Sequence, residues 1–372
     1  MHIGIDLRLH AYSPGGIAYY ARRLAQEMAR LLPPGTLTLI PHRQETALPD
    51  APGARVHRAW TPPHHRLERW LLSAELWPLG LDLLHTPDFI PPQRGARHHV
   101  ITVHDLNFFH YPQYLTADAR RYYNEQIGWA VDHADAILVD SYASQRDLET
   151  MLGVPAERIT VTHLATDPTC FRPLPEEEMR AALARYDLTP GYLLFVGTWE
   201  PRKNLAGLLE ALSLLHGRGE KRELVIAGRP GWLYDEIFER VQRLGLERWV
   251  HFIERVPLDD LVALMNGALL LTMPSFYEGF GLPALEAMHC GTPTVVADRA
   301  SLPEVVGDAG LLIDPDDPAT MAAAYERIAR DEALREALRA AGRRQAATFT
   351  WEKTARQTLE VYGAMLGTSL SA

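Results

Sequence analysis

The sequence predicts an α/β protein of two Rossmann-like domains, each built around a parallel β-sheet, and three observations support this fold class. The 372 residues exceed what one ordinary hydrophobic core accommodates. Short apolar strands alternate with amphipathic helices in both halves of the chain, which is typical of parallel sheets joined by crossover helices. A polar helix bracketed by prolines at residues 172–190 separates the two halves.

The first half predicts a domain over residues 1–172. Its pattern begins with the strand "HIGIDL" and the helix "IAYYARRLAQEMARLL", and it continues with "HHVITVHD", "ARRYYNEQIGWAVDHA", "AILVDS" and "ASQRDLETML". The intervening stretch "RWLLSAELWPLGLDLLH", residues 69–85, has the apolar pattern of a helix. Because it contains Glu75, Pro78 and Asp82, we do not expect it to span a bilayer.

The second half restarts the pattern and predicts a domain over residues 173–350. The expected strands are "YLLFVGT", "ELVIAG", "VHFIERV", "ALLLTMP", "TPTVVAD" and "GLLIDP". The expected helices between them are "NLAGLLEALSLLH", "YDEIFERVQRLG", "LDDLVALMNG" and "PALEAMHC". Residues 351–372 predict one more amphipathic helix.

The composition is that of a soluble globular protein, with 47% hydrophobic and 23% charged residues. A formal net charge of −10 disfavours nucleic acid as a partner. The two cysteines, Cys170 and Cys290, fit neither a disulfide framework nor a zinc site. The opening "MHIGIDLRL" lacks the basic and apolar segments of a signal peptide, so we expect a cytoplasmic protein.

The segment "SFYEGFGLPALEAMHCG" carries the strongest chemical pattern. Pro283 and Gly291 predict a helix between them, preceded by a loop that contains Glu278. The amides at the start of that helix suit a diphosphate, and carboxylates accept hydrogen bonds from vicinal hydroxyls. We therefore expect Glu286, in the first helical turn, to bind the ribose of a nucleotide sugar and Glu278 to bind its sugar. Glu286 could instead be only a favourable charge near a helix start.

Three further stretches follow strands at the same edge of their sheets. "FVGTWEPRKNLAGLLEAL" places Arg202 and Lys203 in a strand-to-helix loop, where cations suit phosphate, although such pairs are more often solvated. "YSPGGIAYYARRL" places two glycines, ending at Gly16, before a helix, which permits close contact with a phosphate or forms only a tight turn. In "VITVHDLNFFHYP", His104 and Asp105 end a strand and precede a loop, where a histidine is more often structural.

Together these stretches resemble the retaining glycosyltransferases of family 4, which have the GT-B fold of two Rossmann-like domains with parallel sheets facing a central cleft. The resemblance covers nearly the whole chain. Its most specific piece is "PSFYEGFGLPALEAMHCGTPTVVADRASLPEVVGDAGLLIDP", which contains the family's two glutamates separated by seven residues. "GTWEPRKN", "VHDL" and "FTWEKTARQTLEVY" agree in order and spacing. In the family the last helix crosses back to the first domain.

The resemblance implies roles for individual residues of the donor site. Lys203 matches a diphosphate-binding lysine, Glu278 a sugar-contacting glutamate and Glu286 a ribose-binding glutamate. Many members carry an arginine where this chain has Thr198, so Arg202 is the nearest substitute for the second cation. The other donor-binding positions implied are Gly16, Gly197, Thr198, Phe280, Gly281 and Leu282, the last three through backbone amides.

The catalytic set implied by the resemblance is His104, Asp105 and Glu278. Family members carry a histidine at the position of His104 that contacts the sugar and phosphate region of the donor. We expect His104 and Asp105 to form the acceptor-facing wall, with a neutral imidazole available to a sugar hydroxyl.

The implied function is a retaining hexosyltransferase that needs no metal ion or other cofactor and uses a nucleoside-diphosphate sugar. Mannose from GDP-mannose is the favoured donor, because "GTWEPRKN" combined with "VHDL" resembles the mannosyltransferase branch. A nucleotide-sugar epimerase on the same fold and a non-catalytic nucleotide-sugar-binding protein are the alternatives.

The acceptor would be a glycan or a lipid-linked glycan. The stretch "ARVHRAWTPPHHRLERW", residues 54–70, combines arginines and histidines with two tryptophans and could contact the inner surface of a membrane. A solvated helix and loop is the more common explanation for such a stretch.

Overall fold

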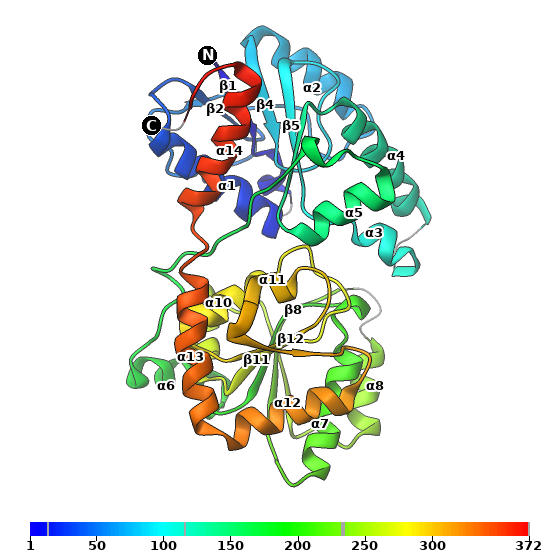
Figure 1. The fold of residues 1–372 in the computed structure, drawn as a ribbon, viewed down its shortest axis with the longest axis vertical. Helices are drawn as coiled ribbons and strands as arrows, with labels where there is room; N and C mark the ends of the chain where they lie inside the picture. The colour runs from blue at the N-terminus through cyan, green and yellow to red at the C-terminus, as the bar shows by residue number, and fades with distance from the viewer. Residues whose placement is uncertain (13–14, 115–116, 232–234, 371–372) are drawn as a thin grey trace. The chain divides into compact units, whose positions relative to one another are not determined.

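The computed structural model describes residues 1–12, 15–114, 117–231 and 235–370, and the chain forms two compact units. Unit 1 consists of Met1–Leu164 and Thr350–Ala372, and unit 2 consists of Ala165–Phe349 (Figure 1). The division at Leu164 lies slightly before the boundary that the sequence places after residue 172. The C-terminal helix belongs to unit 1.

Unit 1 contains, within its described residues, a seven-stranded parallel sheet of order β3-β2-β1-β4-β5-β6-β7. Its strands are β1 (Ile3–Asp6), β2 (Leu37–Ile40), β3 (Arg55–Val56), β4 (Leu81–Thr86), β5 (Ala96–Val103), β6 (Ala136–Val139) and β7 (Ile159–Val161). Its α-helices are α1 (Gly16–Leu31), α2 (Glu68–Leu76), α3 (Asn107–His110), α4 (Ala117–His133), α5 (Tyr142–Leu152) and α14 (Trp351–Leu366).

The stretch 69–85, which the sequence predicts as helical, contains a break and then a strand. After α2 a short 3₁₀ helix, η2 (Trp77–Leu79), leads into β4. Pro78 cannot donate a backbone hydrogen bond, and Gly80 takes a left-handed φ of 59°, so the helix stops here. The helical prediction is therefore wrong from Leu81 onward. β4 pairs with both β1 and β5 in the interior of the sheet.

Helix α14 lies beside α1 (Figure 1). Buried polar side chains join it to the sheet of unit 1. The hydroxyl of Tyr362 lies 2.6 Å from Nδ1 of His85 in β4, and Nε2 of His85 lies 2.8 Å from the Thr102 hydroxyl in β5. Tyr20 of α1 reaches the same hydroxyl at 3.1 Å. Burial lowers the pKa of His85 to about 3, so its neutral ring donates at one nitrogen and accepts at the other.

Unit 2 contains, within its described residues, a six-stranded parallel sheet of order β10-β9-β8-β11-β12-β13. Its strands are β8 (Leu193–Trp199), β9 (Leu224–Pro230), β10 (Val250–Glu254), β11 (Leu270–Met273), β12 (Thr294–Ala297) and β13 (Gly310–Ile313). Its α-helices are α6 (Glu176–Leu183), α7 (Leu205–Gly217), α8 (Asp235–Arg243), α9 (Leu258–Gly267), α10 (Leu282–Cys290), α11 (Leu302–Val306), α12 (Pro318–Arg330) and α13 (Glu332–Ala346).

In each sheet the chain adds strands first on one side of the first strand and then on its other side. In unit 1 the chain builds β2 and β3 on one side of β1 and places β4 on the other side. In unit 2, β9 and β10 lie on one side of β8 and β11 lies on the other. The loops that leave the carboxyl ends of such a strand pair diverge and open a crevice, which is the common ligand position in open α/β sheets. We therefore expect binding residues after β1 and β4 and after β8 and β11.

Gly197 of β8 pairs with Gly228 of β9, and a side chain at Gly228 would meet the backbone of β8. A Cβ atom on Gly228 would lie 1.9 Å from the carbonyl oxygen of Gly197, and its φ of 159° is unusual for other residues. No side chain fits between these two backbones. The lack of a side chain at Gly228 thus permits the path that β8 takes directly before the loop that follows it.

We predict that Gly228→Ala lowers the free energy of unfolding by about 1–3 kcal/mol or more, because the backbones must move apart. Gly217→Ala is the matched control, since nothing lies within 4 Å of its added Cβ in the helix α7. That control should leave stability unchanged or raise it slightly. Thermal unfolding of both variants measures the effect, and equal melting temperatures would contradict the steric argument.

Candidate functional site

The polar centre of unit 2 lies where β8 and β11 diverge. The loop after β8 forms a 3₁₀ turn, η6 (Pro201–Lys203), which carries both Arg202 and Lys203. The loop after β11 carries Glu278 and leads into α10. The structure thus brings together three of the residues that the sequence indicates.

Glu278 is buried, at 7% exposure, and it is held by the two cations. The Lys203 ammonium lies 2.6 and 2.8 Å from the two carboxylate oxygens of Glu278. Arg202 donates to the same carboxylate at 3.2 Å and to Glu200 at 2.6 Å. Although burial raises the pKa of Glu278, the charges of Lys203 and Arg202 outweigh it and bring that pKa to about 2.

The loop of Glu278 is also fixed through its backbone. The Ser301 hydroxyl lies 2.8 Å from the carbonyl of Glu278 and 2.7 Å from that of Phe280. The amide of Phe276 donates to the carbonyl of Arg202 at 2.9 Å. The two loops at this crevice are therefore tied together by main-chain as well as ionic contacts.

Helix α10 starts at Leu282, one residue earlier than the sequence predicts. Gly281 precedes it with a φ of 115°, and a Cβ there would lie 2.7 Å from Leu302. In the described part of the chain, the amides of Gly281 and Leu282 have no protein partner. Such amides at a helix start suit an anion.

The sequence predicts Glu286 in the first turn of α10, and this prediction is wrong. The helix begins before Pro283, and no acidic residue occupies its first turn. Glu286 is partly buried, and burial raises the pKa of its carboxyl to about 7. Among the described residues it has no hydrogen-bond or ion-pair partner. A carboxyl in this state gains from hydroxyl donors on a ligand.

The remaining expected donor residues of unit 2 lie at the end of β8. Gly197 and Thr198 are consecutive residues of this strand and pair with Gly228 and Arg229 of β9. Neither contributes a cation. Arg202 and Lys203 both bond the Glu278 carboxylate, and the role of Arg202 as the second donor-binding cation stays a prediction.

In unit 1, His104 follows β5 and has both ring nitrogens occupied. Nδ1 lies 2.6 Å from the Asp140 carboxylate, and Nε2 lies 2.9 Å from the carbonyl of Pro87. Two acceptors require a donor at each nitrogen. Although burial lowers the pKa of His104, Asp140 and Pro87 raise it to about 9, so the ring is a cation. The expectation of a neutral imidazole free for a sugar hydroxyl is wrong.

The other expected residues of unit 1 have simpler surroundings. One carboxylate oxygen of Asp105 accepts from the backbone amide and side chain of Asn107, at 3.0 and 2.6 Å. The segment after Asp105 forms the one-turn helix α3 rather than a loop. Gly16 is the first residue of α1, with open space at its Cβ position.

Sequence reasoning missed several residues with unusual surroundings. Thr86 is the last residue of the unpredicted strand β4 and Asp88 follows it, so recognising that strand would have placed both at the β1/β4 crevice. Asp140 directly follows β6, and its pairing with His104 spans 36 positions of the chain. In the described residues no group of three or more metal-binding side chains occurs, and no helix is long and apolar enough to cross a bilayer.

Comparisons with known proteins agree with this architecture. A family model described as glycosyl transferases group 1 matches residues 176–345, and one described as Glycosyltransferase Family 4 matches residues 14–169. O-antigen chain mannosyltransferase B of Escherichia coli is 40% identical over 75% of this chain and 74% of its own length. D-inositol 3-phosphate glycosyltransferase of Salinispora arenicola is 36% identical over 63% of this chain and 55% of its own length.

Solved structures share the fold at low sequence identity. Anabaena HepE, determined with UDP and glucose, has a TM-score of 0.77 and 18% identity, covering 98% of this chain and 100% of the other. WaaG, a glycosyltransferase of lipopolysaccharide biosynthesis, has a TM-score of 0.75 and 17% identity with the same coverage. These similarities show the two-domain fold.

The lowered pKa of Glu278 makes stability depend on pH. Its carboxylate, with a folded pKa of about 2 against an ordinary 4.5, stabilises the fold above pH 4.5, and this contribution is lost as the pH falls towards 2. The Lys203→Met/Glu278→Gln double variant lacks this pH-dependent contribution. In that variant Arg202 still has its ion pair with the Glu200 carboxylate. Between pH 5 and pH 2 the wild type should lose about 3 kcal/mol relative to that variant in urea unfolding. If the free energy of unfolding changed with pH by the same amount in the wild type and in the double variant, this prediction would be contradicted.

Proposed function

The chain belongs to glycosyltransferase family 4 and has the GT-B fold, and on that basis we propose that it is a retaining hexosyltransferase acting on a nucleoside-diphosphate sugar. GDP-mannose is the proposed donor, because the relatives O-antigen chain mannosyltransferase B and WbdA are named mannosyltransferases. The proposed acceptor is a hydroxyl of a glycan or lipid-linked glycan. Because the named relatives transfer sugars, the proposal favours transfer over epimerisation or mere binding.

The observation that carries the proposal is the group of Lys203, Glu278 and the start of α10 at the β8/β11 crevice. The lysine ammonium has three N–H donors, and Glu278 uses only part of them. A diphosphate could take the remaining donor together with the free amides of Gly281 and Leu282. These groups supply the positive charge that a metal ion supplies elsewhere, which supports metal-independent transfer.

Glu286 supports the nucleoside side of the proposal. Its carboxyl, with a pKa raised by burial to about 7, has no protein partner among the described residues. The two ribose hydroxyls would donate to its ionised form and relieve the cost of burial. We assign Glu278 to the transferred sugar, since its carboxylate lies beside the cations that would hold the diphosphate.

The charge states of the polar residues bear on the mechanism. Glu278 is ionised and held by Lys203 and Arg202, so it is a weak base. His104 is already protonated and donates at both nitrogens. Neither group is suited to take the acceptor's proton. We therefore propose front-side attack, in which that proton passes to an oxygen of the departing diphosphate and the anomeric configuration is retained.

We predict that GDP raises the melting temperature of the wild type, by an amount equivalent to about 2.7 kcal/mol at 100 times the dissociation constant. Glu286→Ala should weaken GDP binding at least tenfold, and the exposed Glu332→Ala is the matched control. Because the ionised carboxyl binds, wild-type affinity should fall below pH 7, and the Glu286 variant should lack this change. Glu278→Gln should preserve GDP binding and lower turnover.

Transfer itself is tested with GDP-mannose and a mannose-containing glycan in the presence of EDTA. NMR of the product's anomeric proton should show the α configuration of the donor. A β product would overturn retention, loss of activity in EDTA would overturn metal independence, and equal GDP affinity in the wild type and Glu286→Ala would overturn the ribose assignment.

The proposed lipid-linked acceptor agrees with an exposed apolar stripe on α2. Leu67, Trp70, Leu71 and Ala74 follow helical spacing and are all exposed, with Trp70 at 58%. Trp77, at 68% exposure, shares a shallow groove with Trp70. Apolar side chains of this size on one helix face are typical of contact with a partner or a lipid surface.

The charges around this stripe favour an anionic membrane as its partner. Arg66 and Arg94 are exposed, and Arg94 lines the groove of Trp70. The two acids of α2 point away from solvent, because Glu68 bonds Arg8 at 2.6 Å and Glu75 accepts from the amide of Trp60. We propose that this stripe contacts the inner surface of the membrane.

We predict that Trp70→Ser/Trp77→Ser lowers binding to vesicles of phosphatidylglycerol and phosphatidylcholine at least tenfold, because two aromatic side chains no longer leave water. Leu312→Ser, at 43% exposure on β13 in unit 2, is the control and should bind as the wild type does. Co-sedimentation measures binding, and salt should weaken it. Equal binding by the wild type and the tryptophan variant would contradict the proposal.

A further inference from the structure

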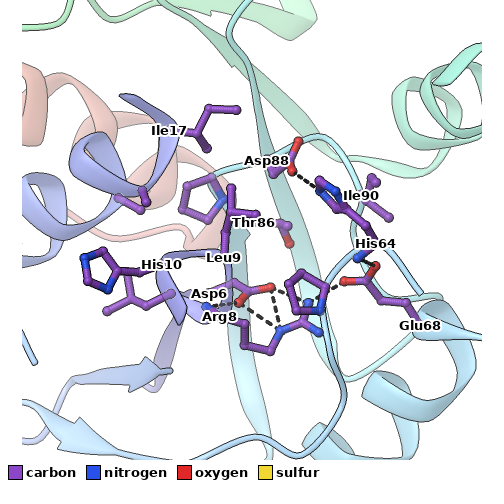
Figure 2. Close-up of a pocket in the computed structure, with 15 residues that line it drawn as sticks. Asp6, Arg8, Leu9, His10, Ile17, His64, Glu68, Thr86, Asp88 and Ile90 are labelled. Atoms are coloured by element: carbon purple, nitrogen blue, oxygen red, sulfur yellow. Dashed lines mark hydrogen bonds and ion pairs between the residues drawn. The ribbon is translucent and has the colours of Figure 1, made fainter. Parts of the chain in front are cut away.

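An aromatic cluster of four residues, Tyr12, His42, Arg43 and Trp60, lies at the carboxyl edge of the sheet of unit 1. Tyr12 comes from the segment after β1, His42 and Arg43 follow β2, and Trp60 follows β3. The strand order β3-β2-β1-β4 places these segments next to one another, on the side of β1 away from β4. Within the described residues, none of the four lines the pocket at the β1/β4 crevice (Figure 2). The cluster is therefore a surface of its own.

Trp60 and Tyr12 present large aromatic surfaces to solvent. Trp60 is 68% exposed and Tyr12 is 49% exposed. Cζ of Arg43 lies 4.1 Å from the centre of the Trp60 ring, so the guanidinium covers one face of the indole. The exposed area of Trp60 belongs mainly to the other face and the edges of its ring, which are open to a ligand.

Three hydrogen-bond donors beside these rings have no protein acceptor among the described residues. They are the guanidinium of Arg43, the indole N–H of Trp60 and the hydroxyl proton of Tyr12. The amide of Gln44 donates to Nδ1 of His42 at 3.3 Å, so Nε2 carries the ring proton. This Nε2 lies 3.1 Å from the Tyr12 hydroxyl and 3.3 Å from the Trp60 carbonyl. The Tyr12 oxygen therefore accepts from His42 and keeps its own proton for a ligand.

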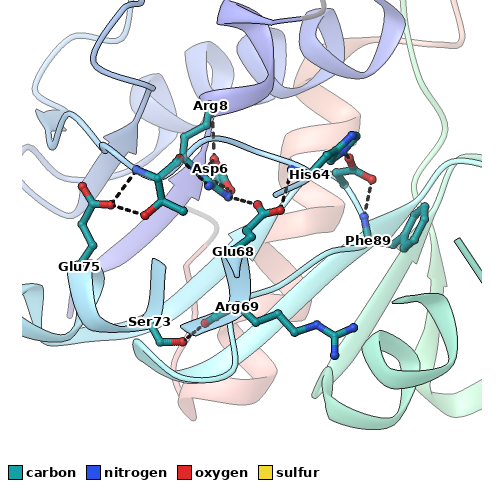
Figure 3. A network of polar contacts seen from close by, with 10 residues as sticks. Asp6, Arg8, His64, Glu68, Arg69, Ser73, Glu75 and Phe89 are labelled. Atoms are coloured by element: carbon teal, nitrogen blue, oxygen red, sulfur yellow. Dashed lines mark hydrogen bonds and ion pairs between the residues drawn. The ribbon is translucent and has the colours of Figure 1, made fainter. Parts of the chain in front are cut away.

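Two carboxylates of α2 hold the backbone segments that carry the two rings (Figure 3). Glu75 accepts from the amide of Trp60 at 2.6 Å. Glu68 bonds the buried side chain of Arg8 at 2.6 Å, shortly before Tyr12 in the chain. Because both segments are fixed to one helix, the rings lose little conformational freedom when a ligand binds.

The chemistry of the aromatic cluster favours a sugar over a lipid surface. A pyranose has an apolar face of C–H groups that packs on an aromatic ring, and its oxygens accept hydrogen bonds from donors at the rim. The exposed side chains beside the rings include Arg43, Gln44 and Arg58, all polar, whereas leucines accompany the tryptophans of the stripe on α2. If Trp60 entered a hydrocarbon layer, the guanidinium packed on it would also have to leave water.

We propose that the aromatic cluster is a second glycan-binding site, which holds an internal sugar of a glycan chain by stacking on Trp60 and by hydrogen bonds from Arg43 and Tyr12. Its role in transfer rests on the proposed function, because it would bind the acceptor chain away from the sugar that reacts. Attachment at a second point raises the effective concentration of the chain without touching the reacting groups. The cluster should therefore favour long glycan acceptors over single sugars.

The binding test uses isothermal titration calorimetry of the full chain with an α-linked mannotetraose and with methyl α-mannoside. The wild type should bind the tetrasaccharide at least tenfold more tightly than the single sugar. Trp60→Ala should weaken the tetrasaccharide about tenfold because the stacking face is lost, and Trp60→Phe should retain most of the affinity because an aromatic ring remains. Leu214→Ala, at 43% exposure on α7, is the control and should bind as the wild type does.

Steady-state transfer from GDP-mannose separates glycan binding from a structural effect of the substitution. Trp60→Ala should raise KM for mannotetraose about tenfold at unchanged kcat, because the lost contact lies away from the reacting sugar. Its kcat/KM for methyl α-mannoside and its affinity for GDP should equal those of the wild type. Since Trp60 is exposed, the melting temperature should also be unchanged.

The possible outcomes distinguish this inference from the proposals on the donor and the membrane. Equal mannotetraose affinity in the wild type and Trp60→Ala would overturn the glycan site. Loss of binding to phosphatidylglycerol vesicles in Trp60→Ala, with mannotetraose binding intact, would identify the cluster as a membrane contact and would also overturn it. If GDP does not bind the wild type but glycan binding depends on Trp60, the donor assignment fails and the glycan site stands.

Discussion

The buried carboxylate of Glu278 is the constraint on which unit 2 depends. At 7% exposure it is too costly to leave unpaired, and both of its cations come from the loop after β8. The loop after β11 can therefore take its position only when η6 is formed beside it. Ser301 and the backbone bond from Phe276 to Arg202 add to the same restraint. The start of α10, with its free amides, is positioned as a consequence.

The two units use the same topological position with different charges. In unit 2 the crevice at β8 and β11 holds Lys203 and Arg202 with Glu278 and Glu200, next to a helix start. In unit 1 the crevice at β1 and β4 has carboxylates around a single arginine, Arg8. The cations and the helix start of unit 2 are the groups that suit a diphosphate, whereas the carboxylates of unit 1 are compensated within the protein by Arg8.

The sequence predicts the two parallel-sheet units because alternating strands and helices are local patterns, and it predicts which loops meet at a sheet edge. It also predicts that Arg202 and Lys203 lie together in the loop after one of these strands. The features that the sequence does not predict depend on contacts between residues far apart in the chain or on local breaks in a helix. Strand β4 was obscured because its apolar residues continue the helical spacing of α2 past Pro78. The protonation of His104 depends on Asp140 and Pro87, which no pattern near His104 reveals.

Glu278 and Glu286 have different pKa values because their surroundings differ, and this difference suggests different roles in ligand binding. Glu278 has its charge compensated by Lys203 before any ligand arrives, so it can stay ionised while buried and serve as a fixed acceptor. Glu286 has no such partner, and its pKa near 7 means that a ligand must supply the compensation. Hydroxyl donors that approach Glu286 would therefore be coupled to its ionisation, whereas those that approach Glu278 would not. Glu286 can thus respond to occupancy of the site, and Glu278 keeps the cations in place when the site is empty.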